Sequence, residues 1–336
     1  LNMQSKHSIE KQTAHYVDCF TTVSEITNNE CRELLDKPAD VVLMNGFEDD
    51  FVPKGATFTG KRKRARSTML RVANCLLGED LGDDTLIIGT SGRYEFKNKG
   101  IDVFLESLNR LNRDKDLKKK VLAFVNVPSW VGDPREDLQK RLKSKDKFTE
   151  PLQCPFITHW LHNMTHDQVL DMLKYLGMGN RPEDKVKVIF VPCYQDGHDG
   201  ILNKHYYDLI LGEDLSVYPS YYEPWGYTPL ESVAFRVPTI TTDLAGFGLW
   251  VNSLKNQHGI NDGVEVLHRS DYNYSEVADG IKDTVALFST KTEAEIKEIR
   301  KRAGQVAEQA LWKHFIQYYY EAYDIALRNA MKRQLK

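Results

Sequence analysis

Two glutamates, Glu223 and Glu231, lie in an aromatic-rich stretch with seven residues between them. Paired carboxylates can serve as the acid and base of glycoside hydrolysis, where they lie about 5–9.5 Å apart. If a helix fills most of the interval, eight residues rise roughly 12 Å, which is too far for that pairing. The spacing therefore favours carboxylates that hold different parts of one extended ligand, such as a nucleotide sugar. The alternative for Glu231 is an ordinary carboxylate on a helix surface.

The residues around the second glutamate also suit a phosphate. Pro229 fits the first turn of a helix, because its missing N–H has no partner there in any case. The free backbone amides of such a turn point towards the preceding loop, where they attract an anion. An apolar segment at 215–218 precedes the stretch, and open α/β sheets bind ligands at the carboxyl ends of their strands. We therefore expect a ligand site at residues 218–231.

A second loop, residues 91–100, brings two cations to the end of another expected strand. Gly92 and Gly100 let the backbone approach a ligand closely. Arg93 can bind phosphate oxygens in a fork, and Lys99 adds a point charge. With a helix N-terminus behind them, these residues suit a diphosphate. A solvated basic loop is the alternative.

These two loops need elements that bring them to one edge of a sheet. Short apolar and β-branched runs predict buried strands at 85–89, 121–125, 186–191, 215–218 and 239–242. Amphipathic stretches that predict helices separate these runs, at 100–111, 137–145, 167–176 and 229–235. This alternation predicts an α/β fold with a doubly wound, Rossmann-like parallel sheet.

The remaining segments do not follow this alternation. Residues 1–55 hold two short strand-like pieces with a helix between them, as expected for the last units of a preceding sheet. We expect a basic helical connector at 56–80 and a long, almost continuous helical segment at 291–332. The segment 127–165 has the least regular pattern, which is typical of an excursion on the surface.

Composition places the chain among ordinary globular proteins. It has 336 residues, of which 41% are hydrophobic and 28% charged, and a formal net charge of −3. Such a charge gives no general attraction to nucleic acid or to an anionic membrane, and no apolar run is long enough to span a bilayer. The five cysteines are scattered and odd in number, which favours reduced thiols and a cytoplasmic location. The chain starts at Leu1 rather than methionine, so we expect a fragment of a longer protein.

Three further groups of residues could carry chemistry, each with a simpler alternative. His159, His162 and His166 could share one helix face and bind zinc, but a polar surface face is the favoured interpretation. The basic run at 61–66 lacks the interleaved aromatics of a nucleic-acid site, so we expect a solvated helix or a contact with a polyanionic surface. The tyrosines at 318–320 could stack on sugar rings, although packing against a neighbouring domain is commoner at helical spacing.

The two loops, taken together with residues 238–248, resemble the glycogen synthases of the fungal and animal type, which form glycosyltransferase family 3 and have the GT-B fold. The string Glu-Pro-Trp-Gly-Tyr-Thr-Pro at 223–229 is far more specific than two glutamates at this spacing. Weaker matches lie at 20–26, 45–46 and 163–164, in the expected order. The resemblance therefore covers most of the chain.

The resemblance implies a retaining transfer of glucose from UDP-glucose to an α-1,4-glucan. Arg93 and Lys99 would hold the donor diphosphate, and Glu223 would contact the transferred glucose. Because two cations already neutralise the diphosphate, no metal is implied, and UDP-glucose is a substrate rather than a cofactor. A starch or sucrose synthase that uses another nucleotide is one alternative, since such enzymes share these elements. The other is a fragment that binds the donor nucleotide and is inactive alone.

The resemblance also implies a set of residues that bind the donor nucleotide. This set consists of Tyr206, Gly226, Tyr227, Thr228 and Glu231. The turn at 226–228 would hold phosphate and Glu231 the ribose hydroxyls. Tyr206 would pack on the uracil, a place that Tyr207 could take after a shift of one residue.

An incomplete enzyme is a further implication. A GT-B enzyme has two Rossmann-like domains, and residues 56–310 correspond to the C-terminal, donor-binding one. Residues 1–55 would be the end of the N-terminal domain, and 311–336 a helix that crosses back onto it. Aromatic residues at 315–323 should then lie on an exposed patch. The missing N-terminal domain and the glucan are thus the expected partners, and a homo-oligomer is left open.

One region departs from the family. Eukaryotic glycogen synthases carry an arginine-dense helix that senses glucose 6-phosphate, whereas residues 297–302 of this chain are short of arginines and include an acid. This difference puts regulation by a sugar phosphate in doubt. We interpret the charge cluster as part of a solvated helix.

Overall fold

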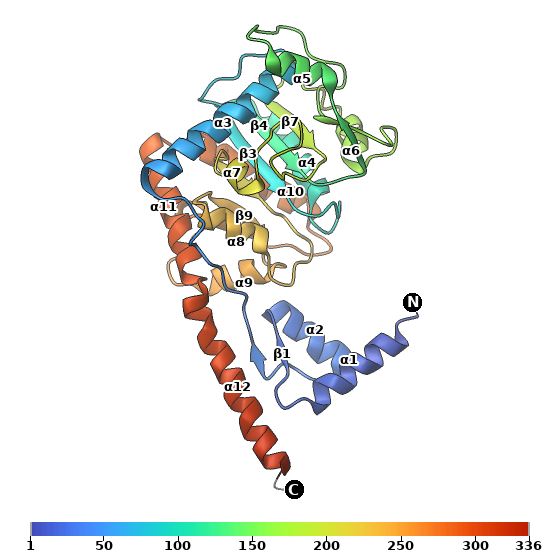
Figure 1. The fold of residues 1–336 in the computed structure, drawn as a ribbon, viewed down its shortest axis with the longest axis vertical. Helices are drawn as coiled ribbons and strands as arrows, with labels where there is room; N and C mark the ends of the chain where they lie inside the picture. Colours follow the sequence, from blue (N-terminus) through green and yellow to red (C-terminus); the bar gives the residue numbers. More distant parts are fainter. Residues whose placement is uncertain (1, 335–336) are drawn as a thin grey trace.

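Six parallel strands form the central sheet of the computed structural model, which describes residues 2–334. The strands are β3 (Leu86–Ser91), β4 (Val121–Asn126), β7 (Val186–Val191), β8 (Leu215–Val217), β9 (Thr239–Thr242) and β10 (Val264–Leu267). Their order is β10-β9-β8-β3-β4-β7, so the chain winds outwards from β3 in both directions (Figure 1). The predicted doubly wound α/β fold is confirmed. The sequence pattern missed β10, a short edge strand that is only partly buried and carries Glu265 in its middle.

The inner strands are covered on both faces, which explains their nearly continuous apolar sequences. Ile88 of β3 enters one core and its neighbour Ile87 enters the other. The helices of the first core are α4 (Ile101–Asn112), α6 (Gln168–Leu176) and α10 (Tyr274–Ser289). Those of the second are α3 (Gly55–Leu77), α5 (Glu136–Lys143) and α7 (Tyr206–Ile210). The sheet therefore has both faces buried, and its two edges are formed by β10 and β7.

A third core joins the sheet domain to the C-terminal helices. It forms around α8 (Tyr227–Ala234), α9 (Gly246–Ser253), α11 (Glu293–Gln309) and α12 (Trp312–Gln334). The short helix η1 (Ile260–Asp262) contacts α11 but contributes Ile260 to the first core. Trp225, in the loop before α8, packs edge-on against Phe247 of α9 and Phe315 of α12, with ring centroids 6.2 and 6.1 Å apart. The loop at 218–226 is thus fixed to the C-terminal helix by a buried aromatic side chain.

A small N-terminal unit lies beside the far end of α12 (Figure 1). It contains α1 (Gln4–Tyr16), β1 (Thr21–Thr22), α2 (Glu25–Leu35) and β2 (Val41–Val42), and its two strands pair in parallel. Asn329 of α12 donates a hydrogen bond of 2.8 Å to the carbonyl of Asp18. Two short strands with a helix between them are what the sequence predicts here. The domain boundaries at 55 and 310 remain predictions.

The chain passes between the N-terminal unit and the sheet domain twice, and the two connecting segments are hydrogen-bonded to each other. The N–H of Phe47 donates to the carbonyl of Ala310 at 3.0 Å, and the N–H of Trp312 donates to the carbonyl of Phe47 at 3.2 Å. Beyond this junction, α12 leaves the sheet domain with Tyr320 and Tyr323 exposed and Phe315 buried. Among the described residues no helix is long and apolar enough to cross a membrane.

The segment 127–165 has more structure than its sequence suggests. Strands β5 (Val131–Pro134) and β6 (His159–Leu161) pair in antiparallel fashion, with an irregularity between Val131 and Pro134. Helix α5 lies between them and contributes Leu138 to a core. The segment is therefore a structured extension of the sheet domain.

Two arginines of the basic run at 61–66 point inward, so the predicted solvated helix is wrong for them. Arg62 and Arg66 each donate to the carboxylate of Asp214, at 2.6 and 2.7 Å. Asp214 is buried at the amino end of β8 and also accepts the N–H of Ile87 at 2.9 Å. Because burying a cation is costly without a partner, this carboxylate is what allows the two arginines of α3 to lie largely buried here.

The charge cluster at 297–302 is likewise not fully solvated. Arg300 is buried and donates to the carbonyl of Glu213 at 3.1 Å. Burial, together with the nearby Arg62, lowers the pKa of Arg300, although Asp214 opposes the shift. The helical periodicity alone did not reveal which basic residues face inward, because arginine can bury its stem and guanidinium where carbonyls converge.

Glu213 is a buried carboxyl next to this cluster, and it supports a prediction about pH. Burial raises its pKa to about 8, although the Ser216 hydroxyl, which donates to its Oε2 at 2.5 Å, opposes the rise. Between the ordinary value of 4.5 and about 8, the folded chain holds a proton that the unfolded chain has released. The free energy of unfolding must therefore fall as pH rises through this window.

We expect Glu213→Gln to remove this pH dependence, because an amide keeps the Ser216 hydrogen bond and does not titrate. Relative to the unsubstituted chain, the variant should gain on the order of 2–4 kcal/mol between pH 5 and pH 8. Urea unfolding at both pH values measures the change. Glu276→Gln, at an exposed position in the first turn of α10, is the matched control and should leave the pH dependence intact. Equal pH slopes in the unsubstituted chain and Glu213→Gln would contradict the prediction.

Candidate donor-binding site

The carboxyl ends of the central strands open onto a cleft of about 360 Å³. Its lining residues come from the loops after these strands and from two helix starts: Ser91, Gly92, Arg93, Tyr94, Asn126, Pro128, Cys193, Tyr194, Gln195, Tyr206 and Thr228. Parallel strands bring their carboxyl ends to one edge, so loops far apart in sequence meet there. The structure places three of the predicted site residues, Arg93, Tyr206 and Thr228, in the wall of this one cleft.

The two cations of the loop after β3 differ in their exposure and in their ion-pair partners. Arg93 has 76% of its side chain exposed and makes an ion pair of 2.8 Å with Glu95 of its own loop. Lys99 is largely buried and makes an ion pair with Glu223. Arg93 is therefore available to an incoming anion, whereas Lys99 is already held beside the second loop.

Gly100 lets the two loops approach each other. It begins α4 with φ of 68°, and a side chain there would collide with the carbonyl of Pro219 and the guanidinium of Arg269. The N–H of Tyr221 also donates to the carbonyl of Asn98 at 2.8 Å. These contacts fix the distance between the cations of one loop and the carboxylate of the other.

The segment that carries Glu223 is also hydrogen-bonded to the residues that follow β9. The N–H of Glu223 donates to the carbonyl of Leu244 at 3.0 Å, and the N–H of Gly246 donates to the Glu223 carbonyl at 3.1 Å. These bonds position the carboxylate next to Lys99 before any ligand arrives. Such preorganisation lowers the cost of binding a ligand in one orientation.

Helix α8 starts two residues before the sequence predicts. Gly226 precedes it with φ of 110°, and Tyr227 and Thr228 form its first turn. The helix therefore covers only the second half of the interval between Glu223 and Glu231, so the rise expected from a helix through most of that interval does not apply. The early start places the free amides of the first turn next to Thr228 at the cleft, which suits an anion.

The two neighbouring tyrosines of α7 have different surroundings. Tyr206 lines the cleft, and its hydroxyl lies 3.0 Å from the Ser91 hydroxyl. Tyr207 instead stacks on Phe235, with ring centroids 5.2 Å apart, and donates to Glu231 at 2.9 Å. Of the two candidates for a stacking residue, Tyr206 is the one at the cleft.

Glu231 does not line the cleft in this structure. Burial raises its pKa, and the hydrogen bond from Tyr207 acts against that rise. Glu231 is half-buried and accepts a hydrogen bond from Tyr207, which distinguishes it from a fully solvated carboxylate on a helix surface. A ribose hydroxyl that reached Glu231 would have to share the carboxylate with Tyr207.

Arg269 contributes to the site and has no signal in the sequence, because it follows the missed strand β10. Its guanidinium donates to the carbonyl of Pro219 and lies 5.5 Å from the ring of Tyr221. Burial lowers the pKa of Arg269, while Asp102 of α4 raises it. This buried cation therefore joins the segment after β10 to the loop that carries Glu223.

The three histidines do not form the predicted arrangement. His159 lies in β6 and is buried, whereas His162 and His166 are exposed outside any helix. They therefore share no helix face, and the zinc hypothesis built on that face is wrong. The favoured alternative, a polar surface face, is also wrong for His159.

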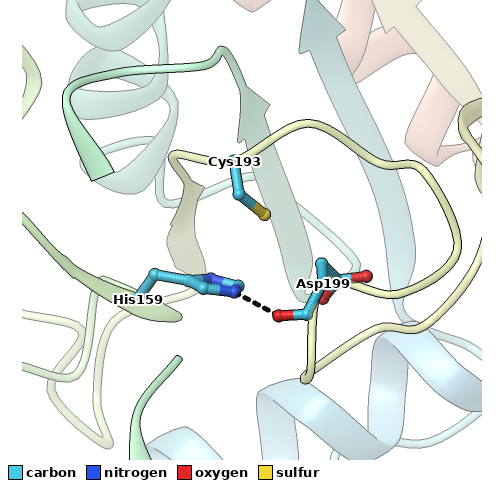
Figure 2. A group of neighbouring side chains, drawn as sticks. All are labelled: His159, Cys193 and Asp199. Atoms are coloured by element: carbon cyan, nitrogen blue, oxygen red, sulfur yellow. Dashed lines mark hydrogen bonds between the residues drawn. The ribbon is translucent and has the colours of Figure 1, made fainter. Parts of the chain in front are cut away.

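His159 does lie near two other potential metal ligands, Cys193 and Asp199 (Figure 2). Both of its ring nitrogens are already hydrogen-bonded: Nε2 to the Asp199 carbonyl at 2.7 Å and Nδ1 to the Thr158 hydroxyl at 2.9 Å. The Asp199 carboxylate accepts the N–H of Ile201 at 3.0 Å. Burial raises the pKa of Cys193 to about 12, which disfavours the thiolate that metals bind. The hydrogen bonds of His159 and Asp199 therefore fix the conformation of the loop after β7.

Comparison with solved structures identifies the class of fold. The catalytic domain of starch synthase IV from Arabidopsis thaliana, bound to ADP and acarbose, aligns with a TM-score of 0.58 at 12% identity, covering 95% of this chain and 57% of that one. Sucrose-phosphate synthase from Thermosynechococcus elongatus aligns with a TM-score of 0.53 at 17% identity, covering 99% and 62%. The chain has the fold of the GT-B glycosyltransferases.

Sequence comparison identifies the family within this class. The family model described as glycogen synthase matches residues 2–133 and 133–336, so the chain belongs to the glycogen synthase family. Glycogen [starch] synthase from Neurospora crassa is 28% identical over 97% of this chain and 54% of the relative. Isoform 2 from Saccharomyces cerevisiae is 29% identical over 98% of this chain and 56% of the relative. The chain thus spans about half the length of the curated relatives it matches.

Proposed function

We propose that this chain is the donor-binding part of a retaining glucosyltransferase that transfers glucose from UDP-glucose to an α-1,4-glucan. The observation that carries the proposal is the meeting of Arg93, the Lys99–Glu223 ion pair and the first turn of α8 at one edge of the sheet. Cations, helix amides and a carboxylate at one place suit a sugar diphosphate. The family supports the donor and the glucan, since its relatives are called glycogen [starch] synthase.

In this proposal the cations act on the leaving group. Arg93 exchanges Glu95 for the diphosphate, which its exposure allows. Lys99 and the amides near Thr228 stabilise the charge that develops on the departing UDP. Two cations supply the neutralisation that a metal would otherwise give, so the proposed site uses neither metal nor cofactor.

The remaining residues bind the rest of the donor. Glu223 accepts hydrogen bonds from the glucose hydroxyls, and Glu231 accepts them from the ribose. Tyr206 packs on the uracil from the cleft wall, and the turn from Gly226 through Tyr227 contacts phosphate. This assignment follows the order of groups along UDP-glucose.

The proposal includes a second domain upstream of this chain. The exposed tyrosines of α12 and the two-stranded N-terminal unit are surfaces that such a domain would cover. The glucan would then bind between the two domains. We extend the proposal to a cytoplasmic location, in keeping with five free cysteines. A homo-oligomer is left open.

The direct test is a calorimetric titration with UDP. We expect Arg93→Ala to weaken UDP binding about 10- to 100-fold, because a charge-assisted hydrogen bond contributes about 1.5–3 kcal/mol. Arg113→Ala, at the exposed end of α4, should bind UDP normally and is the matched control. Unchanged affinity in Arg93→Ala would remove the diphosphate assignment. A parallel titration with ADP distinguishes a starch synthase type of donor, and turnover with and without the upstream region tests whether the chain is inactive alone.

A further inference from the structure

Arg269 is a buried cation to which the proposed function gives no role. It follows the edge strand β10 and is only 5% exposed. The backbone around it is fixed by side chains: the N–H of Arg269 donates to the carboxylate of Asp243 at 2.9 Å, and the amide of Asn273 donates to the carbonyl of His268 at 2.9 Å. The guanidinium therefore extends from a restrained segment rather than from a free loop.

The guanidinium of Arg269 lies where the two loops of the donor site cross. Its Nη1 donates to the carbonyl of Pro219, four residues before Glu223. A side chain at Gly100, the residue after Lys99, would approach the same Nη1 to 2.7 Å. Arg269 therefore lies against both segments, close in sequence to the two residues that form the Lys99–Glu223 ion pair.

The other contacts at this crossing involve neutral groups. The N–H of Tyr221 donates to the carbonyl of Asn98 at 2.8 Å, and the ring of Tyr221 lies 5.5 Å from the guanidinium. A hydrogen bond from a charged donor is about twice as strong as one between neutral groups. The bond from Arg269 to Pro219 is therefore the strongest single contact that holds the two loops together here.

Arg269 is buried at a cost to stability. Burial lowers the pKa of Arg269, and Asp102 of α4 acts in the opposite sense. The Oδ1 atom of Asp102 is itself buried and has no hydrogen-bond partner among residues 2–334. A buried charge that no carboxylate binds directly is unfavourable, and folds retain such exceptions chiefly at functional sites. The position of this cation thus calls for a functional reason.

We propose that Arg269 is a positioning residue for glucose transfer, because it holds Lys99 and Glu223 in the arrangement that the reaction needs. It touches neither donor nor acceptor and acts through the carbonyl of Pro219. The inference rests on the proposed function, in which Glu223 holds the glucose while Lys99 stabilises the departing UDP. Both groups must be placed correctly at the same moment, and a misplacement of about 1 Å can lower a rate about 10²-fold.

This role separates the rate of transfer from the affinity for the donor. Arg93 and Thr228 line the cleft where the diphosphate is proposed to bind, whereas Arg269 does not line it. Loss of the guanidinium should therefore leave UDP affinity normal. An arrangement that matters only in the transition state lowers the turnover number and kcat/KM equally when it is lost.

The test measures initial rates over a range of UDP-glucose concentrations, on the chain with its upstream region restored. Methionine keeps much of the apolar stem of Arg269 and removes the donor. We expect Arg269→Met to lower the turnover number about 10- to 100-fold, with KM for UDP-glucose within about threefold of normal. Arg269→Lys restores a charged donor without the planar fork and should recover part of the rate. Calorimetric titration with UDP should give normal affinity for both variants.

The matched control is Arg141→Met, which removes a guanidinium of similar function away from the site. Arg141 donates to the carbonyls of Cys75 at 2.9 Å and Glu150 at 2.7 Å, and it does not line the donor cleft. Its loss should lower the thermal midpoint and leave the turnover number unchanged. Far-ultraviolet circular dichroism and the thermal midpoint establish that each variant is folded.

The outcomes separate this inference from the proposed function. A normal turnover number in Arg269→Met overturns the inference, and so does a loss of UDP affinity as large as the loss of rate. Equal losses of rate in Arg269→Met and Arg141→Met also overturn it, because general destabilisation then accounts for both. If Arg269→Met does not fold, Arg269→Lys decides, since a full rate in that variant contradicts a need for the guanidinium. An unsubstituted chain that does not bind UDP contradicts the proposed function itself, and the inference falls with it.

Discussion

Replacing Lys99 with alanine should lower the turnover number for glucan elongation by about 10²–10³-fold, the size of effect seen when one group that stabilises developing charge is removed. Lys99 is the cation that pairs with Glu223, and its side chain is only 15% exposed, so the exposed Arg93 of the same loop cannot take its place. Its loss also leaves Glu223 without a counter-ion in a partly buried position. The measurement is the initial rate with UDP-glucose and a glucan primer, on the chain with its upstream region restored.

The control for this prediction comes from the same loop. Lys97 is exposed and two residues away, so Lys97→Ala makes the same change of charge without touching the ion pair. It should retain most of the activity. The assigned role of Lys99 is refuted if Lys99→Ala keeps more than a third of the turnover number, or if both variants lose activity equally. Lys99→Arg should rescue only part of the rate, because a planar guanidinium cannot replace a compact ammonium in a fixed ion pair.

The largest expected effect on stability comes from Asp214→Ala, which should cost about 3–5 kcal/mol because it leaves buried cations without a partner. Arg62 and Arg66 both bind this carboxylate, and Arg300 lies nearby. Urea unfolding at pH 7 provides the measurement. Asp84→Ala, at an exposed position near the same cluster, is the control and should change stability by less than about 0.5 kcal/mol.

The effect of Asp214 should also depend on pH, with a definite sign. Burial alone would raise the pKa of Asp214, but Arg66 and Arg62 outweigh it and hold the pKa below its ordinary value of 3.8. A group with a lowered folded pKa stabilises the fold above the unfolded value and loses this contribution as pH falls through the folded value. The difference between the unsubstituted chain and Asp214→Ala should therefore shrink in acid. A difference of less than 1 kcal/mol at pH 7 would show that the cluster is not a main source of stability.

The sheet could be predicted because its inner strands are buried on both faces. Runs such as Val121–Asn126 are then almost continuously apolar, and that pattern needs no knowledge of the partner strands. Strand β10 lacks this pattern because it is short, only partly buried and carries Glu265. For the same reason the sequence did not predict a role for Arg269, which follows this strand.

The two loops of the site could be predicted from their sequences because their residue types have few other roles at the carboxyl ends of strands. Glycine beside arginine and lysine, and glutamate before a helix with proline in its first turn, are combinations that suit phosphate. The sequence did not reveal which charged residues of a helix face the protein interior and which face the solvent. The helical pattern predicts solvated positions for Arg62 and Arg300, whereas in the fold they donate to the carbonyls of Leu211 and Glu213, which are distant in sequence. The partners of such residues follow from the tertiary fold alone.

The contact between Asp18 and Asn329 has a consequence for how the chain reaches its final shape. These residues are 311 positions apart, so at about 5–20 residues per second Asp18 waits roughly 15–60 s on the ribosome before its partner has been made. The sheet domain, whose strands end at Leu267, is complete before α12 exists. The N-terminal unit must therefore dock onto an already folded neighbour.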